Sequence, residues 1–510
     1  MTSSQRVLIN TIAQYSRTIV NMTLSLYTVR LVLASLGQSD YGLYSLIAGV
    51  VAMLSFITNS LVSTTQRFIS FYQGKSDIQK LKEVFNNSLV IHIILGTILV
   101  LILVALTPLL FNGFLNIPVG RGQAAITIYY IVAIMLFISF VNAPYRALLI
   151  SHENIVYISV IDVLDAIIKV VLVIIMTYSD CDKLIFYSFI MLGVQFFNLC
   201  ALSMYCYAKY KECTRPNICR LNIIYVKDLS KYAGWNIYGT LCITGRNQGI
   251  AILLNKMFGT VMNAAWGIGA QISGYTQFLS TSVVNAMSPQ IVKAEGGGDR
   301  ERTLFLSNIL SKTNYFLMSM IGIPCIFEIG GILKLWLGNF PEETAFFAII
   351  FIVAQLLDAM TIGLTHVNNA IGKIGLYTIV MCTPKLFTFI IAFLLMNLGL
   401  SISAVAIAYI LIEGVCSLTR VPMISRQAGL NVRDFYLDVI IREILPTIVC
   451  VLVCWGCVSF LEFPYRFLLT IFLSAFLYAV TFYFWGLTKV EKGIMHNLCH
   501  SIYSKILKSK

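Results

Sequence analysis

The residues KYKECTRPNICRLNIIYVKDLSKY (209–232) form the longest polar interval between apolar runs in this sequence. Six of them are basic, whereas only Glu212 and Asp228 are acidic. Long apolar segments follow one another in the same order on both sides of this interval. We therefore interpret residues 209–232 as a basic cytoplasmic linker that joins two helical lobes, and we expect the functional site to lie between the lobes.

The composition of the chain is that of a membrane protein. Of its 510 residues, 58% are hydrophobic and 12% are charged, whereas soluble domains carry about 25% charged residues. Apolar runs of roughly 20 residues recur along the sequence, and each is long enough to cross a hydrocarbon core of about 30 Å. Because lipid offers the backbone no hydrogen-bond partners, such runs must be helical. The sequence therefore predicts an all-α integral membrane protein.

We expect about fourteen spans, six in each lobe and two more toward the C-terminus. Those before the linker are 10–33, 41–64, 85–111, 124–145, 154–178 and 184–208. Those after it are 233–254, 261–285, 303–329, 344–370, 375–397, 401–424, 439–460 and 465–487. The predicted domains are a first lobe (1–208), the linker (209–232), a second lobe (233–425), two additional helices (426–487) and a basic amphipathic cytoplasmic tail (488–510).

The formal net charge of +13 fits the bias of cytoplasmic loops toward Lys and Arg. Loops on one side of the predicted spans carry several times more basic residues than loops on the other side. We therefore expect both termini in the cytoplasm and no nucleic-acid partner. The 13 cysteines show no paired spacing and are interpreted as free thiols. Neither a metal site nor a cofactor is expected.

The sequences of the two predicted lobes also resemble each other, which indicates an internal repeat. The second span ends in QRFISFYQGKSDIQKLKEVFNNSL (66–89), and the eighth ends in PQIVKAEGGGDRERTLFLSNIL (289–310). Gln66 corresponds to Gln290, and Gly74 corresponds to Gly298, at one constant offset. Parallel repeats on either side of a linker are typical of transporters with a central site.

The stretch RLVLASLGQSDYGLYSLIAGV (30–50) is similar to the first helical hairpin of polysaccharide flippases. With its two lobes and two extra C-terminal spans, the chain resembles the polysaccharide (O-antigen, lipid-linked oligosaccharide) flippase branch of the multidrug/oligosaccharidyl-lipid/polysaccharide exporter superfamily. The resemblance implies a transporter of the bacterial cytoplasmic (inner) membrane. Its cargo would be a polyprenyl-diphosphate-linked oligosaccharide, flipped by alternating access for surface polysaccharide and lipopolysaccharide biosynthesis. The implied partners are this substrate, membrane lipids and polysaccharide polymerase or assembly proteins.

Polar stripes on several spans predict a hydrated cleft between the lobes. Successive helical residues turn by about 100°, so Arg17 and Asn21 share a face of the first span. Helix–helix contacts are the alternative explanation for such stripes. A diphosphate suits two-pronged hydrogen bonds from Arg, and sugars suit amide side chains. The candidates for binding the headgroup are Arg17, Arg246, Lys385, Asn21, Asn59, Asn236 and Asn247.

Carboxylates at membrane depth are candidates for coupling transport to a gradient. Asp165 and Lys169 are four residues apart, which favours a structural pair. Asp162, on the same face, is then left over and can exchange a proton or bind a cation. Together with Asp358 and Glu413, it forms our set of coupling residues. Glu295–Gly298 reads EGGG without the Gly-Lys of a phosphate-binding loop, so the glycines do not indicate nucleotide binding. We therefore expect an ion or proton gradient to drive transport.

Two other functions stay open. A cation-coupled multidrug or organic-cation extruder of the same superfamily would have acidic walls and few buried arginines, which contrasts with Arg17 and Arg246. An integral-membrane glycan-processing enzyme would need a large polar loop with carboxylates or His, whereas the longest loop here is short and basic. We therefore expect a transporter and not an enzyme.

Overall fold

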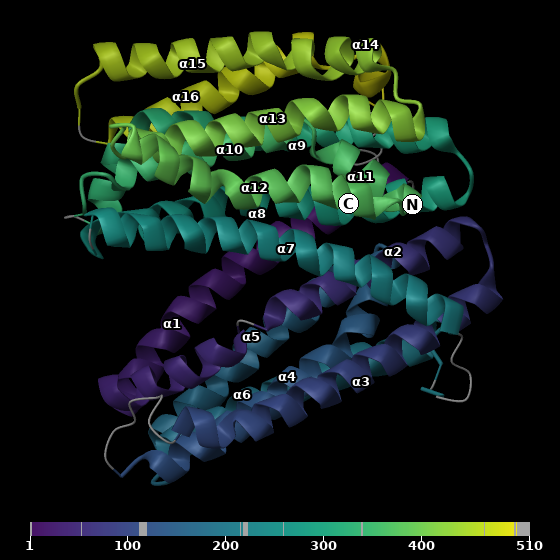
Figure 1. Cartoon of the computed structure of the whole chain (residues 1–510), viewed down its shortest axis with the longest axis vertical. Helices are drawn as coiled ribbons and strands as arrows, with labels where there is room; N and C mark the ends of the chain where they lie inside the picture. Colours follow the sequence, from purple (N-terminus) through teal and green to yellow (C-terminus); the bar gives the residue numbers. More distant parts are fainter. Residues whose placement is uncertain are drawn as a thin grey trace, which may run out of the picture. The chain divides into compact units, whose positions relative to one another are not determined.

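The computed structural model describes residues 3–52, 54–111, 120–214, 216–217, 223–258, 260–337, 340–463, 465–493 and 496 (Figure 1). Every regular element in these residues is a helix, and none of them forms a strand. The predicted all-α fold is therefore confirmed.

The chain divides into two compact units, and the boundary between Ile237 and Tyr238 falls inside one long helix. The first unit, Arg6–Ile237, contains α1 (Ser3–Ala52), α2 (Ser55–Gly74), α3 (Ile78–Leu109), α4 (Gly122–Ser151), α5 (Ile155–Thr177), α6 (Lys183–Lys209) and the start of α7 (Ile223–Phe258). Residues 223–232, the last part of the predicted linker, are already helical. The remaining domain boundaries stay predictions.

The second unit comprises Tyr238–Lys510 together with Met1–Gln5. After the rest of α7 it contains α8 (Thr260–Gly296), α9 (Arg300–Leu337), α10 (Thr344–Ala359), α11 (Ile362–Ile371), α12 (Ile374–Asn397) and α13 (Ser403–Ala428). The C-terminal segments are α14 (Val432–Phe435), the π-helical η3 (Tyr436–Ile441), α15 (Arg442–Phe460), α16 (Arg466–Thr481) and the π-helical η4 (Phe482–Gly486). The predicted tail (488–510) lies mostly outside the described residues.

Local sequence signals fix several helix ends. Asp77 accepts a hydrogen bond from the Lys80 backbone N–H at the start of α3, and Asp182 accepts one from the Leu184 N–H at the start of α6. Each aspartate satisfies a donor that the first helical turn leaves unpaired. At the other end, Gly429 terminates α13 with a φ of +73°, a conformation that glycine adopts without a steric cost.

Two predicted spans differ from the structure. The turn expected between the first and second spans is helical, so α1 continues to Ala52 and the second span is divided between α1 and α2. Gly37 and Gly42 each weaken a helix by about 1 kcal/mol, but neither removes a backbone N–H as proline does. The tenth span is broken into α10 and α11, which are bent by 52°.

The helix surfaces fit a lipid environment. Among the described residues, seven helices are long and apolar enough to cross a membrane, and α10 with α11 would make an eighth. Large apolar side chains stand out from the helices: Phe472 is 73% exposed and Leu398 is 80% exposed. Such surfaces are unfavourable in water and favourable in hydrocarbon.

The two units repeat one packing order. In the first unit, α4 packs against α2, α3 and α6, and α5 packs against α6. In the second unit, the corresponding span, α10 with α11, packs against α8, α9 and α13, and α12 packs against α13. The packing thus agrees with the internal repeat predicted from the sequence.

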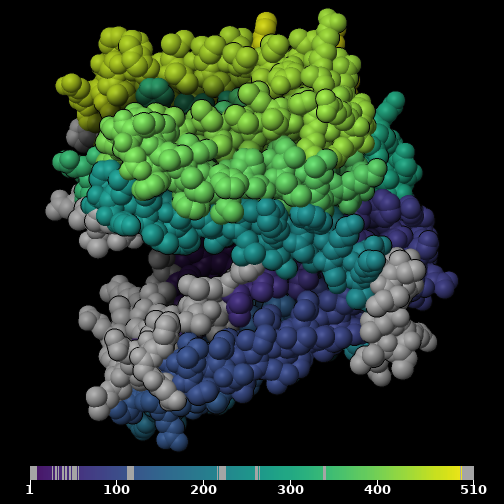
Figure 2. All heavy atoms as spheres, in the orientation of Figure 1, coloured from purple at the N-terminus to yellow at the C-terminus, as the bar shows by residue number. Residues whose placement is uncertain are grey.

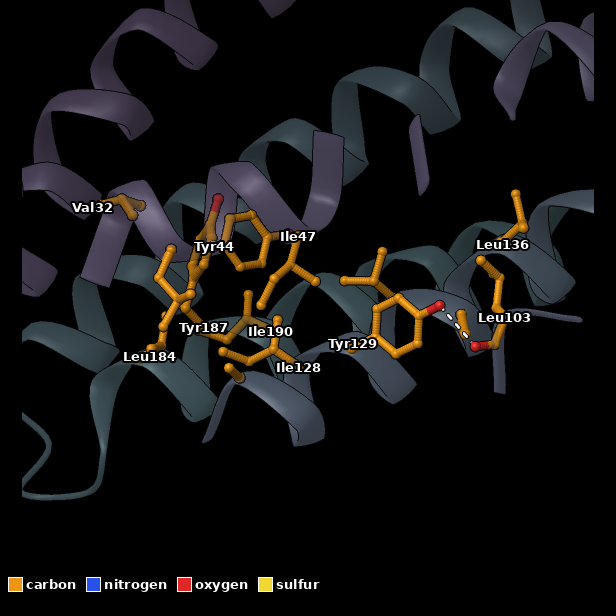
Figure 3. Packing of buried hydrophobic residues seen from close by; sticks show 14 of the residues in the cluster. Val32, Tyr44, Ile47, Leu103, Ile128, Tyr129, Leu136, Leu184, Tyr187 and Ile190 are labelled. Atoms are coloured by element: carbon orange, nitrogen blue, oxygen red, sulfur yellow. Dashed lines mark hydrogen bonds between the residues drawn. The ribbon is translucent and has the colours of Figure 1, made fainter. Parts of the chain in front are cut away.

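Aliphatic and aromatic residues from several helices build the core of the first unit (Figure 3). The Tyr44 and Tyr187 rings meet edge to face with centroids 4.8 Å apart. Tyr129 is buried and donates its hydroxyl hydrogen to the Leu103 carbonyl oxygen at 2.8 Å. A buried tyrosine hydroxyl needs a hydrogen-bond partner. The bond from Tyr129 to Leu103 therefore links α4 to α3 at a defined position.

The additional C-terminal helices α15 and α16 pack on α9, and Figure 2 shows these segments in yellow and yellow-green at one edge of the second unit. Glu328 of α9 is buried and accepts hydrogen bonds from Arg466 Nε at 2.9 Å and from the Thr470 hydroxyl at 2.8 Å. Near the other end of α9, Lys312 donates to the Glu491 carboxylate at 2.7 Å. These charged contacts attach the C-terminal segments to α9 at two separated points.

Candidate functional site

A chain of ion pairs runs through the second unit and joins α7, α12, α13 and α10. Arg246 of α7 donates from Nη1 to Glu413 Oε2 of α13 at 2.9 Å. Lys385 of α12 donates from Nζ to the other oxygen of that carboxylate, and the same Nζ lies 4.0 Å from Asp358 Oδ1 of α10. Two predicted headgroup residues and two predicted coupling residues therefore meet in one network.

Arg420 of α13 completes this network at the break between α10 and α11. Its Nη2 donates to Asp358 Oδ1 at 2.7 Å, and its Nη1 donates to the Thr361 hydroxyl at 2.9 Å. Thr361 is the residue that precedes α11. The guanidinium thus ties the bent span to α13.

The network is buried and carries an excess of positive charge. The side chains of Arg246 and Arg420 are 7% and 4% exposed, and that of Glu413 is 4% exposed. Three cationic side chains share two carboxylates, so one positive charge has no acidic partner among the described residues. The Nε atoms of Arg246 and Arg420 also lack hydrogen-bond partners. Such a site has both the charge and the free donors to receive an anion.

Tyr409 contacts Arg246, one of the cations of this network. The Arg246 guanidinium carbon lies 4.1 Å from the centroid of the Tyr409 ring, within the range of a cation–π contact. The Tyr409 hydroxyl donates to Asn247 Oδ1 at 3.3 Å. Asn247, a predicted headgroup residue, therefore supports Arg246 through the tyrosine.

A second charged cluster lies in the first unit. Arg17 of α1 and Arg146 of α4 each donate to Asp162 Oδ2 of α5 at 2.7 Å. The Arg17 and Asp162 side chains are 19% and 15% exposed. From the sequence we expected Asp162 to be left without a partner. In the structure two guanidiniums share its carboxylate.

The expected pair of Asp165 and Lys169 is not formed in the described part of the chain. Asp165 instead accepts a hydrogen bond from Asn198 of α6, and Asn198 Oδ1 accepts one from Asn142 of α4 at 2.7 Å. The four-residue spacing brings two side chains onto one helix face, but here a neighbouring helix supplies a closer partner for the carboxylate.

The remaining predicted asparagines lie in the first unit. Asn236 donates to the Thr64 hydroxyl at 3.2 Å, and Asn59 is exposed. The Asn21 side-chain oxygen is buried without a hydrogen-bond partner. Their roles, and the expected cleft between the lobes, stay predictions.

Sequence reasoning missed Arg146 and Arg420, although signals for both exist. Arg420 follows Glu413 by seven residues, which places the two on one helix face. Arg146 and Asp162 lie at similar distances from the turn between α4 and α5, so a helical hairpin brings them together. By sequence alone, Arg146 counts among the basic residues of the cytoplasmic loops, because it follows the predicted span 124–145.

A polar contact outside the spans joins the linker to the turn between α4 and α5. His152 Nε2 lies 2.5 Å from Glu212 Oε1, and the His152 ring stacks on Tyr210 with centroids 4.0 Å apart. Burial acts to raise the pKa of Glu212, but the hydrogen bonds from His152 and from the Glu212 backbone outweigh it and hold that pKa below its usual value.

Within the described residues, no three His, Cys, Asp or Glu side chains gather closely enough to hold a metal ion. Both clusters consist of paired charges.

No protein-family model matches this chain, and no curated protein matches it. A MATE protein in complex with MaD3S aligns with a TM-score of 0.73 at 14% identity, covering 84% of this chain and 97% of that chain. An outward-facing multidrug resistance MATE family transporter of the MOP superfamily aligns with a TM-score of 0.70 at 14% identity, covering 84% and 96%.

A third solved structure is a MOP superfamily transporter from Pyrococcus furiosus Vc1 (DSM3638), described by the reverse polarity of its binding pocket. It aligns with a TM-score of 0.70 at 12% identity, covering 85% of this chain and 97% of that chain. The polysaccharide flippase branch stays a prediction at these identities. The chain thus shares the fold of these MATE and MOP superfamily structures, and its long apolar helices fit a multi-pass membrane protein.

Proposed function

We propose that this protein transports an amphiphile with an anionic headgroup, a polyprenyl-diphosphate-linked oligosaccharide, across the bacterial cytoplasmic membrane. The observation that carries the proposal is the buried network of the second unit. Within the part of the chain that the structure describes, Arg246, Lys385 and Arg420 share two carboxylates, those of Asp358 and Glu413. A charge at this depth costs at least about 2.5–3.5 kcal/mol, so an unmatched cation favours an anionic ligand.

The proposed mechanism is an exchange of partners. A diphosphate competes with Glu413 for Arg246 and Lys385, and it accepts hydrogen bonds from the guanidinium in two-pronged geometry. Protonation of Glu413 or Asp358 releases the cations for the headgroup, which couples transport to a proton gradient. Loss of the proton restores the ion pairs and expels the headgroup. Alternating access presents the network first to the cytoplasm and then to the outside.

A cation-coupled drug extruder is the second candidate. It is favoured by the comparisons, because the matched solved structures include a multidrug resistance MATE family transporter. In that mechanism, Asp358 and Glu413 bind the organic cation or the coupling ion. The ion pairs with Arg420 and Lys385 speak against it, because each carboxylate already has a cationic partner.

Reconstitution in liposomes separates the two candidates. A fluorescent polyprenyl-diphosphate glycan and a fluorescent organic cation are each followed with and without a proton gradient. We expect glycan transport and no cation transport. Arg246→Lys keeps the ion pair with Glu413 but loses the two-pronged donor, so we expect glycan transport to fall at least roughly tenfold. Arg17→Ala should likewise reduce transport.

The matched control is Arg426→Lys, because Arg426 is exposed at the end of α13 and should tolerate the change. Thermal unfolding of each variant checks that folding is retained. Transport of the organic cation, together with unchanged glycan behaviour in Arg246→Lys, would establish the extruder instead.

A further inference from the structure

A cavity of about 220 Å³ lies inside the first unit, and its lining residues are not those of the charged clusters. It is bounded by α2, α3 and the first turns of α7, and its walls are mainly apolar, with Leu61, Ile91, Leu95 and Ile237 among them. An engineered apolar cavity of about 150 Å³ is large enough to bind benzene. This cavity therefore has room for a larger, two-ring molecule.

One polar atom at this cavity has no partner. His92 of α3 lines the cavity and is 2% exposed. Its Nδ1 lies 2.6 Å from the Ser88 carbonyl oxygen, and a carbonyl can only accept, so Nδ1 carries the proton. Nε2 of the neutral ring is then an acceptor, and no group in the described part of the chain donates to it.

Three other polar groups of the wall are already paired, and a fourth, Ser230, is exposed. The Thr65 and Ser88 hydroxyls are hydrogen-bonded to each other at 2.5 Å. The Thr64 hydroxyl donates to the Ser60 carbonyl oxygen at 2.8 Å and accepts from Asn236. The cavity thus offers an apolar volume with one buried acceptor, His92 Nε2, that has no partner in the described part of the chain. Buried acceptors without partners are rare in folded proteins.

We propose that this cavity binds a small, mostly apolar molecule that carries one hydroxyl or N–H donor, which hydrogen-bonds to His92 Nε2. Phenols and fused-ring alcohols have this chemistry. The site is separate from the charged network, and the proposal does not depend on which solute the protein transports. Because the occupant contacts α2, α3 and α7 at once, its binding stabilises the packing of these helices.

The test compares 2-naphthol with naphthalene, which has the same rings without the hydroxyl. Both are titrated into the full-length protein at a fixed detergent concentration. We expect both to bind, with 2-naphthol tighter. His92→Phe keeps the ring but removes the acceptor, so 2-naphthol affinity should fall by roughly three- to tenfold, the value of one hydrogen bond, while naphthalene affinity stays the same.

Gly234→Leu is designed to obstruct the cavity from its exposed side. Gly234 lines it, and a Cβ at this position meets nothing within 4 Å, so the variant should fold and lose both ligands. His366→Phe, which alters a histidine of the second unit, is the matched control and should bind both ligands normally.

A direct measurement on the unaltered protein completes the test. The 15N resonance of His92 Nε2, assigned by its loss in His92→Phe, should shift with 2-naphthol and not with naphthalene. Equal 2-naphthol binding by His92→Phe and the wild type, unchanged binding by Gly234→Leu, or an unmoved Nε2 resonance would each overturn the proposal.

Discussion

Individual charged residues in this protein are held by specific partners on other helices. Arg420 illustrates the point, because its guanidinium binds the side chain of Asp358 and the hydroxyl of Thr361. Removing one member of a buried pair leaves the other charge uncompensated, which costs more than the pair contributes. The buried residues should therefore be sensitive to neutral replacements even where they do not touch a substrate.

Arg420→Met should lower the free energy of unfolding by about 3–5 kcal/mol, because it leaves Asp358 with only the more distant Lys385. The thermal unfolding midpoint in detergent measures the effect. Arg426→Met, an exposed change on the same helix, should stay within about 0.5 kcal/mol of the wild type. An equal midpoint for both variants would contradict a structural role of the Arg420 pair.

Glu212 should make the attachment of the linker depend on pH. Its pKa is lowered in the folded protein, so its contribution to stability is fully present above the unfolded value of about 4.3 and is lost as the pH falls through the lower folded value. We expect the wild type to unfold at a higher temperature than Glu212→Gln near neutral pH, and the difference should shrink only below about pH 4.3. A difference that stays constant at lower pH would contradict the assignment.

At the scale of elements, the broken span α10–α11 brings its backbone unusually close to α9. The Gly363 N–H donates to the Ser311 hydroxyl oxygen at 3.1 Å. A Cβ on Gly363 would overlap the Ser307 carbonyl oxygen and lie 2.7 Å from the Ser311 oxygen. The glycine therefore permits the contact between α11 and α9, and the bend in turn presents Asp358 and Thr361 to Arg420.

Gly363→Ala should destabilise the protein by at least about 1–3 kcal/mol, because two backbones must move apart. Gly414→Ala is the matched control: it lies within α13, and its added Cβ meets only Leu357 at 4.0 Å. That change should stabilise the helix by up to about 1 kcal/mol. Unfolding midpoints that move in the same direction for both variants would argue against the close approach.

At the scale of the whole molecule, the repeat predicts how the loops are distributed across the membrane. The turn between α8 and α9 corresponds to the turn between α2 and α3, and both carry basic residues that favour the cytoplasm. The loop between α5 and α6 should then face outward. It contains Cys181, which is exposed, so the natural sequence provides a probe of the orientation.

A membrane-impermeant maleimide should label the wild type in intact cells, and Cys181→Ser should abolish this labelling. When Gly297→Cys is added to Cys181→Ser, the new thiol between α8 and α9 should react only after the membrane is permeabilised. Labelling of that thiol in intact cells would reverse the proposed orientation and place the termini outside.

The sequence by itself determined that this protein is an all-α membrane protein with repeated lobes. Long apolar runs leave no other choice, because a backbone in lipid must satisfy its own hydrogen bonds. It also identified Arg246, Lys385, Asp358 and Glu413, because charges at membrane depth are costly enough to be conspicuous.

Only the tertiary structure decided which charges are partners. Asp165 binds Asn198 and not Lys169, and Arg146 and Arg420 join the clusters from helices whose facing could not be read from the sequence. Helical periodicity gives the face on which a residue lies, but not the helix that packs against that face. The partner of a buried charge is fixed by contacts between helices far apart in the sequence, and these exist only once the chain has folded.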